Sequence, residues 1–256
     1  MKNKTVGLLL RIKRYALVSL TLLAFLIVGV PSLEAAAPTE GIAGTAHDLS
    51  GKNFDGSMNN EICAFCHTPH GANTTSYSGA APLWNKGTAT QTSFTMYGAT
   101  NANTAGVTLA GTATQANIAP SSAICLSCHD GISGVNSIVN LPGSGGYVPG
   151  GQLVNLSGNY TPYQIQGVFA VGLNGNMAND HPISLPYRGD EANPPAGLRP
   201  TSTPIVDWIG ATTIADLLRG GNVECVSCHN PHARSASFLR SSNNRQSVIC
   251  FACHAK

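Results

Sequence analysis

The sequence predicts a fold that is mostly irregular coil with a few short helices. Three observations support this prediction. Beyond its first residues the chain is rich in Gly, Ala, Ser, Thr and Asn, and only 6% of all residues are aromatic. The long stretches 73–121 and 140–179 show no sustained apolar period of helix or strand type. All eight cysteines fall in four closely spaced pairs. Composition alone would also fit a disordered linker, but the cysteine pairs favour coil that is wrapped over a cofactor.

The N-terminal residues have the order of a secretory signal peptide. Basic residues precede an apolar run over 15–30, and small residues follow it. We therefore expect a signal peptide over 1–35, cleaved after Ala35 or Ala36, and one mature domain over 36–256. A membrane anchor is the alternative, but the run is shorter than the roughly 20 apolar residues that span a bilayer. The expected location is secreted, extracellular or at the cell surface, with the periplasm as alternative.

Removal of this leader makes the chain acidic. The whole chain has 14 basic and 12 acidic residues, for a formal charge of +2. The leader holds five of the basic residues and one of the acidic ones, which leaves 9 and 11 and a charge of −2. Nucleic acid is therefore not an expected partner, because its binding requires a basic face. No membrane anchor is expected after cleavage.

Few regular elements are expected. Thr213 and Asp216 have the spacing of a capping box, so 217–219 should form a short helix that ends at the two glycines after it. Residues 203–204 can begin another helical turn, and 168–171 has the composition of a short strand. Each Cys-x-x-Cys pair should occupy about one helical turn.

Every cysteine pair is followed at once by a histidine, although the chain has only 8 histidines. Disulfides are an alternative in an exported chain, and zinc ribbons also use Cys-x-x-Cys. Neither requires histidine at this position four times, whereas the attachment of haem c does. The expected haem-attaching residues are Cys63, Cys66, Cys125, Cys128, Cys225, Cys228, Cys250 and Cys253. The expected proximal iron ligands are His67, His129, His229 and His254.

The spacing of the motif fits this chemistry. Residues three and four apart share a face of a helical turn, so two thioether bonds can hold the haem edge while the imidazole reaches the iron. We therefore expect four covalently bound haem c groups, stacked as the core that the side chains do not supply. Without haem the chain should not fold, because ordering so much coil costs about 1–2 kcal/mol per residue.

Four haems require four sixth ligands, and four histidines remain: His47, His70, His181 and His232. Two of these, His70 and His232, occur in the same repeated phrase, Cys-x-x-Cys-His-x-Pro-His. A histidine three residues after the proximal ligand cannot reach the other face of the same haem. Both are therefore expected to bind the iron of an adjacent haem in a closely stacked pair.

The other two sixth ligands are less constrained. Asp180 can orient the ring of His181. His47 lies so near the mature N-terminus that it can bind a haem of its own chain or a haem of another molecule. The rival ligands are three methionines: Met58, Met96 and Met177. If every iron binds two histidines, no iron is open to substrate. The sequence has no paired carboxylates, phosphate loop or Ser-His-Asp signature, so we expect that the chain is not an enzyme.

The chain has four Cys-x-x-Cys-His motifs, two of which extend to Cys-x-x-Cys-His-x-Pro-His. It also has the early segment His47-Asp48-Leu49-Ser50 and the later segment Asn179-Asp180-His181-Pro182. In these features the chain resembles the extracellular tetrahaem c-type cytochromes that polymerise into nanowires, the OmcE-like family. The resemblance implies bis-histidine haems in a continuous stack through a head-to-tail homopolymer. It also implies that one haem takes its sixth ligand from the adjacent subunit, and His47 matches that donor by position.

Three functions remain in view. The first is extracellular electron transfer as the subunit of a conductive filament, with redox donor and acceptor proteins or extracellular acceptors as partners. The second is a monomeric periplasmic tetrahaem shuttle, which becomes the better interpretation if His47 binds a haem of its own chain. The third is a haem-based reductase with one open iron site.

Overall fold

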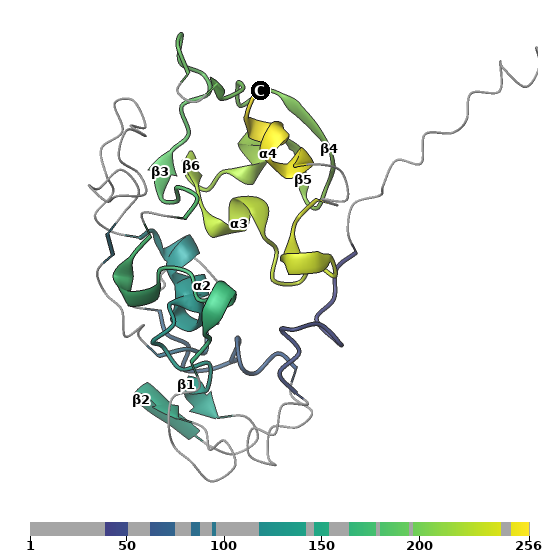
Figure 1. The fold of residues 1–256 in the computed structure, drawn as a ribbon. Helices are drawn as coiled ribbons and strands as arrows, with labels where there is room; N and C mark the ends of the chain where they lie inside the picture. Colours follow the sequence, from purple (N-terminus) through teal and green to yellow (C-terminus); the bar gives the residue numbers. More distant parts are fainter. Residues whose placement is uncertain are drawn as a thin grey trace, which may run out of the picture. The chain divides into compact units, whose positions relative to one another are not determined.

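The computed structural model describes residues 39–50, 62–74, 83–87, 94–95, 118–141, 146–153, 164–177, 180–194, 197–241 and 247–255. All of them belong to one compact unit, Ala36–Lys256 (Figure 1). The expected signal peptide and much of the two long coil stretches lie outside the described residues, and those expectations stay predictions. Within the described ranges, no helix is both long and apolar enough to cross a membrane.

The regular elements are short and are separated by irregular chain, which confirms the prediction of coil with few helices. The helices are α2 (Pro120–His129), α3 (Cys225–Cys228), α4 (Val248–Cys253) and the 3-10 turns η1 (Gly167–Phe169), η2 (Leu173–Gly175), η4 (Ile214–Leu217) and η5 (Ala236–Phe238). The strands are β1 (Ser137–Leu141), β2 (Gly146–Leu153), β3 (Leu185–Pro186), β4 (Pro204–Trp208), β5 (Ala211–Thr213) and β6 (Asn222–Val223). They pair antiparallel as β1 with β2, β3 with β6, and β4 with β5.

The predicted capping box is confirmed. The Asp216 carboxylate accepts hydrogen bonds from the backbone N–H and the hydroxyl of Thr213 at 2.8 and 3.0 Å. The backbone N–H of Thr212 also donates to this carboxylate, and its bond, followed by those from Thr213, holds the pKa of Asp216 at about 2, below its usual value. The element that they cap is the 3-10 turn η4, which ends at Leu217 instead of beginning there.

Two other local predictions are wrong. Residues 204–208 form strand β4 and not a helical turn, because Ile205 and Trp208 point into the core while their neighbour Val206 is exposed. Residues 167–169 form the 3-10 turn η1 and not a strand. The hairpin of β1 and β2 was not predicted. Its pairing shifts register between Ile138 and Asn140, so the sequence does not show the regular alternation of apolar and polar residues that indicates a strand.

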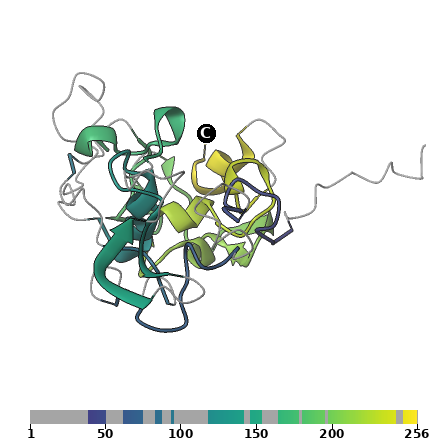
Figure 2. The ribbon, with the colours of Figure 1, turned by 90° about the horizontal axis from the view of Figure 1, so that it is seen from below.

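The apolar core is divided into small clusters that lie against the cysteine motifs. One cluster joins Leu126 of α2 to Met177 and Ile183, and Cys225 packs on it. The second gathers Ile205, Trp208, Ile214 and Leu217 and packs against Cys253 and its neighbours in α4. Helix α2 contacts α3 directly, and both views of the ribbon show the two side by side (Figures 1 and 2). Much of the packing in the described parts therefore surrounds the motifs themselves.

Candidate haem-binding sites

Each Cys-x-x-Cys-His motif forms a helical turn, as predicted. The second motif ends α2, and the third and fourth lie on α3 and α4. In the first motif the carbonyl of Cys63 accepts hydrogen bonds from the backbone N–H groups of Cys66 and His67 at 3.1 and 2.8 Å. In the third and fourth motifs the histidine N–H donates to the carbonyl of the first cysteine at 3.0 Å in each. These bonds hold the cysteines and the histidine of each motif on one turn.

All eight cysteines are described, and none of them forms a disulfide. Burial raises the pKa of the Cys66 and Cys228 thiols to about 12, so these groups are neutral. Zinc binds thiolates that gather in one group. Within the described ranges, no three or more His, Cys, Asp and Glu side chains are gathered in such a group. The thiols therefore fit thioether attachment better than either alternative.

The imidazole rings are oriented by backbone carbonyls. Nδ1 of His129 lies 2.8 Å from the carbonyl oxygen of Phe169, and Nδ1 of His229 lies 2.8 Å from that of Ser237. Nδ1 of His47 is 3.2 Å from the carbonyl oxygen of Pro231. When Nδ1 donates to a carbonyl, Nε2 carries the lone pair that binds a metal. This tautomer is the one that haem iron requires.

His181 is oriented in the same way but not by the predicted residue. Its Nδ1 lies 3.0 Å from the carbonyl oxygen of Pro182. A backbone carbonyl, and not the carboxylate of Asp180, therefore lies against this ring nitrogen, so the expected role of Asp180 in holding it is wrong. Burial lowers the pKa of both His47 and His181, which favours the neutral, metal-binding form of each.

Three pairs of histidine rings face each other at nearly one distance. The ring centroids are 6.2 Å apart for His47 and His129, 6.3 Å for His67 and His232, and 6.5 Å for His181 and His254. Two metal–nitrogen bonds of about 2.0–2.1 Å, with about 1.1 Å from each nitrogen to its ring centroid, give about 6.2–6.4 Å across one metal ion. Each pair joins one proximal histidine to one predicted sixth ligand. The residues therefore fit bis-histidine haem.

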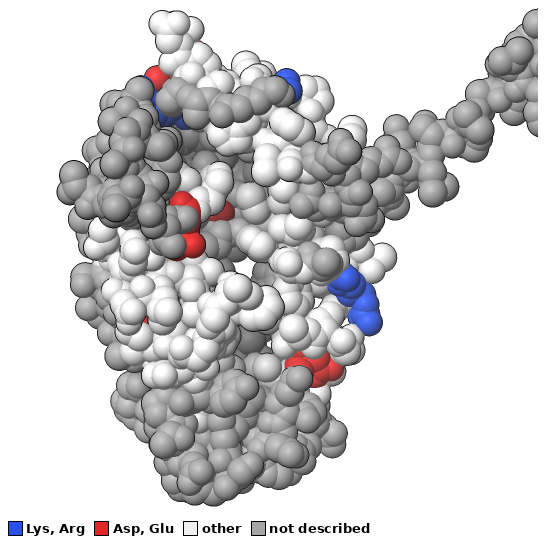
Figure 3. Space-filling view, viewed as in Figure 1, with Lys and Arg blue, Asp and Glu red and all other residues white. Residues whose placement is uncertain are grey.

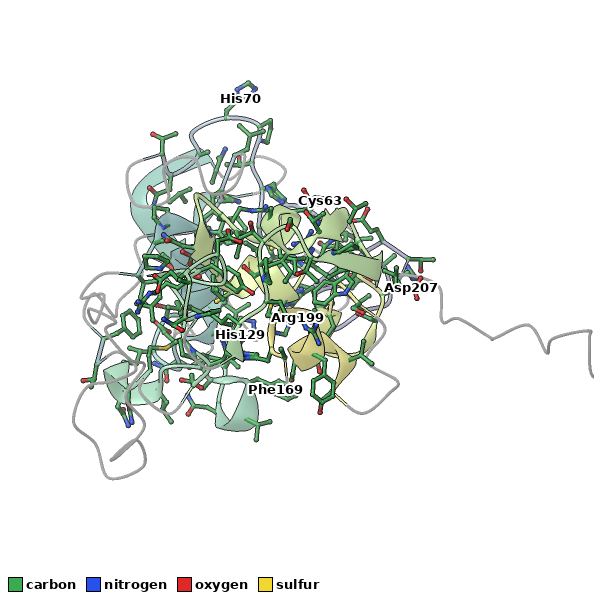
Figure 4. The ribbon with its side chains drawn as sticks, turned by 90° about the horizontal axis from the view of Figure 1, so that it is seen from above. Cys63, His70, His129, Phe169, Arg199 and Asp207 are labelled. Carbon is green, nitrogen blue, oxygen red and sulfur yellow. The ribbon has the colours of Figure 1, made fainter. Side chains whose placement is uncertain are left out.

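The remaining two histidines form no such pair among the described residues. His229 is the proximal ligand of the third motif, and its ring is exposed. His70 is also exposed and lies at the edge of the molecule, where its side chain points outward (Figure 4). Its loop is nevertheless anchored, because the carbonyl of His70 accepts hydrogen bonds from Thr68 Oγ1 and Asn140 Nδ2, each at 2.8 Å. The ring therefore points outward from a loop that hydrogen bonds hold in place.

The expected role of His47 as a donor to the next subunit stays a prediction. In this chain its ring stacks on Phe238 with centroids 3.9 Å apart and lies 6.2 Å from the ring of His129. Met177, one rival ligand, is 2% exposed and packs among Leu126 and Ile183, so it is used in the core. Met58 and Met96 lie outside the described residues.

Apolar side chains are exposed beside the motifs, where a porphyrin would cover them. Phe169, next to His129, is 67% exposed, and Phe251, inside the fourth motif, is 45% exposed. Leu83, whose carbonyl accepts a hydrogen bond from the residue after His67, is 51% exposed. Charged side chains are scarce on the described part of the face in Figure 3. These surfaces fit an apolar macrocycle.

The motifs follow one another in space in their chain order. Electrostatic coupling places the Cys66 thiol near that of Cys128. The thiols of Cys125 and Cys225 interact directly, and Cys228 is coupled to Cys253. Each motif therefore lies beside the next, from the first to the fourth.

A buried carboxyl group joins the second and third motifs. Glu224 is 1% exposed, and its Oε2 accepts hydrogen bonds from Ser122 in α2 and from Ser184 at 3.0 Å. Its Oε1 has no hydrogen-bond partner among the described residues. Burial raises the pKa of Glu224. Burial therefore shifts this carboxyl group toward its protonated form relative to a carboxyl group in water.

This raised pKa predicts a pH dependence of stability. Because the folded state binds more protons than the unfolded state, the free energy of unfolding should fall as pH rises from about 4.3 through the raised pKa. In a Glu224→Gln variant the amide keeps the acceptor oxygen and cannot ionise, so this part of the dependence should disappear. Thermal unfolding of both holoproteins between about pH 4 and 7 would check it. An equal slope in the two proteins would contradict the prediction.

Sequence reasoning missed a polar residue that repeats at three motifs. We call Asn85, Arg199 and Arg240 the latch residues. The backbone N–H of each donates to the carbonyl of the second cysteine of one motif, at 2.8, 2.8 and 2.9 Å. The side chain of each donates to the carbonyl of the first residue between the two cysteines, at 2.6, 3.1 and 3.2 Å. They serve the first, fourth and third motifs respectively.

The residue before each latch residue also forms a β-bridge with the proximal histidine. The bridges join Trp84 to His67, Leu198 to His254, and Leu239 to His229. No sequence signal marks these positions, because two latch residues follow their motifs at different distances and Arg199 precedes its motif by 51 residues.

Comparison with known proteins identifies the last part of the chain. A family described as "Doubled CXXCH motif" matches residues 218–256, which hold the third and fourth motifs. No curated protein matches the chain. The doubled motif indicates a multihaem c-type cytochrome, with covalently bound haem c and a role in electron transfer. The first and second motifs lie outside the matched residues.

Proposed function

We propose that this chain is a secreted electron carrier with four haem c groups, each held by two histidines, and that it is the repeating subunit of a conductive filament. The observation that carries the proposal is the common spacing of the three histidine ring pairs, 6.2, 6.3 and 6.5 Å. When bound, haem supplies a one-electron redox centre. The cysteines would attach it, paired histidines would bind its iron, and apolar side chains would cover it.

The order of the motifs supports a continuous stack. The ring pairs support His232 as the sixth ligand of the haem at the first motif, His47 at the second and His181 at the fourth. Because the thiols of consecutive motifs interact with one another, haems attached to them would have neighbouring edges. An electron can then pass along the chain without an open iron, so no catalytic site is proposed.

His70 is the best candidate for the donor to an adjacent subunit, in place of His47. His70 and His229 are both exposed, and neither forms a ring pair among the described residues. A contact that places His70 of one subunit against His229 of the next would be head-to-tail, and head-to-tail contacts whose rotation does not close into a ring generate filaments. Every iron would then have two histidines.

Two other functions each have an observation in their favour. Pairing of His47 with His129 inside the chain favours the monomeric periplasmic shuttle. The exposed His229 favours a reductase with one open iron, if no neighbour provides the sixth ligand.

Electron microscopy of the secreted, haem-loaded protein tests the proposal. Filaments with all haems low-spin and no binding of carbon monoxide are expected. Discrete particles of single-chain mass would support the shuttle instead. Binding of one carbon monoxide per chain in the assembled protein would support the reductase.

A further inference from the structure

The latch residues make the same hydrogen bonds at three motifs but differ in charge. At the first motif the latch residue is Asn85, which is neutral. At the third and fourth motifs it is an arginine, Arg240 and Arg199. The hydrogen bonds to the motif do not require a charge, because the amide of Asn85 makes the equivalent bond at 2.6 Å. The positive charge at the third motif therefore calls for a different role.

Arg240 is more deeply buried than Arg199. It is 5% exposed, whereas Arg199 is partly exposed. Its guanidinium donates to the carbonyl oxygens of Val226, Ile209 and Gly210 at 2.9–3.2 Å. All these acceptors are neutral, and the described residues provide no carboxylate within ion-pair distance, since the ion pair they contain joins Arg188 to Glu191.

The charged groups that act on the Arg240 guanidinium from its surroundings are few. They are Arg219 and Asp216. Both are exposed, so water and salt screen their charges. The guanidinium itself donates to the carbonyl oxygen of Val226, between the two cysteines of the third motif, at 3.2 Å, so its charge lies beside the attachment site. A buried unit charge of this kind is screened much less than one at the surface.

We propose that Arg240 is a redox-tuning residue, whose buried charge raises the reduction potential of the haem attached to the third motif. The inference rests on the proposed function only in requiring haem at this motif. Reduction adds one electron from the external reductant and removes one positive charge from the iron site. A nearby fixed positive charge therefore favours the reduced state, and net charge and burial are known determinants of haem potential. The backbone contacts of Arg240 fix the position of that charge.

The first motif also has a buried cation nearby, because Lys86 acts on Cys66. For this reason the test compares the potential of one haem in the wild-type protein with that of the same haem in a variant, and not the potentials of haems at different motifs. The Arg240→Asn variant places at this position the residue found at 85, which keeps a donor and removes the charge. Arg240→Lys keeps the charge and changes the shape of the donor.

Spectropotentiometric titration of the purified holoproteins is the measurement. In Arg240→Asn one component should move to lower potential while the others stay in place, and in Arg240→Lys that component should stay near its wild-type value. Arg188→Gln, which removes an exposed, ion-paired arginine, is the control and should shift nothing. The difference should persist at high salt, because the charge is buried.

Two results would overturn the inference. One is a wild-type titration curve in Arg240→Asn with its haem content intact. The other is an equal shift in the Asn and Lys variants, which would mean that Arg240 acts through packing. If the Arg240→Asn variant loses haem, Arg199→Asn gives the deciding measurement. We then expect the potential of the haem at the fourth motif to fall by a smaller, salt-sensitive amount. No shift in that potential would contradict the charge effect. Absence of haem from the third motif in the wild-type protein would contradict the proposed function itself.

Discussion

A His232→Ala variant is expected to convert one haem iron from low-spin to high-spin while every haem stays attached through its cysteines. The reason is the 6.3 Å separation of the His232 and His67 rings, on which we base the proposal that His232 is the sixth ligand of the first haem. Alanine offers no replacement ligand. One haem equivalent per chain should therefore bind carbon monoxide after reduction, and the absorption spectrum should show the corresponding high-spin fraction.

The ring planes make this prediction specific to one haem. The planes of His67 and His232 are 13° apart, whereas those of His47 and His129 and of His181 and His254 are 65° and 72° apart. The angle between axial imidazoles sets the anisotropy of a low-spin ferric signal in electron paramagnetic resonance. His232→Ala should remove a signal of the near-parallel class. The matched variant His181→Ala should remove one of the inclined class. An unchanged spin state in His232→Ala would refute the ligand assignment.

A His70→Ala variant is expected to abolish filaments or to raise the concentration needed for assembly at least tenfold. Loss of about 1.4 kcal/mol at each interface already gives a tenfold change, and a coordination bond should contribute more. The subunit should stay folded, because the ring of His70 is exposed and points outward, while its backbone carbonyl keeps its bonds to Thr68 and Asn140. Sedimentation and microscopy would measure assembly.

The comparison variant for this experiment is His47→Ala. It should make one iron high-spin within each chain, since His47 faces His129, and leave the His70 contact available for assembly. If His47→Ala removes filaments and His70→Ala does not, the donor is His47 after all, and the intrachain pairing of His47 does not exist in the assembled protein. If both variants assemble like the wild type, axial ligation does not join the subunits.

Spacing in the sequence was sufficient to predict the local chemistry. Cys-x-x-Cys-His specifies a helical turn by itself, and the histidine count gave candidates for the sixth ligands. The capping box at Thr213 and Asp216 was predictable for the same reason, because its partners are three residues apart. Such contacts depend on few residues, so a single sequence contains the signal.

The longer-range features were not predictable. Which sixth ligand faces which proximal histidine depends on how the coil folds back, and nothing in the neighbourhood of His47 points to residue 129. Nothing in the sequence around Arg199 and Arg240 points to the motifs that these residues contact in the structure. Strand β4 was misjudged because Thr203 and Pro204 favour a helix start locally, whereas the burial of Ile205 and Trp208 decides the outcome.

The intact mass of the secreted protein, measured under denaturing conditions, tests the central claim most directly. Because thioether bonds survive unfolding, the account predicts the mass of the chain from about residue 36 onward plus four haem groups. Removal of any one cysteine pair, such as Cys125→Ser with Cys128→Ser, should lower the count by one. A mass with fewer than four haems, or with the loss of hydrogen that disulfide formation causes at any pair, would contradict it.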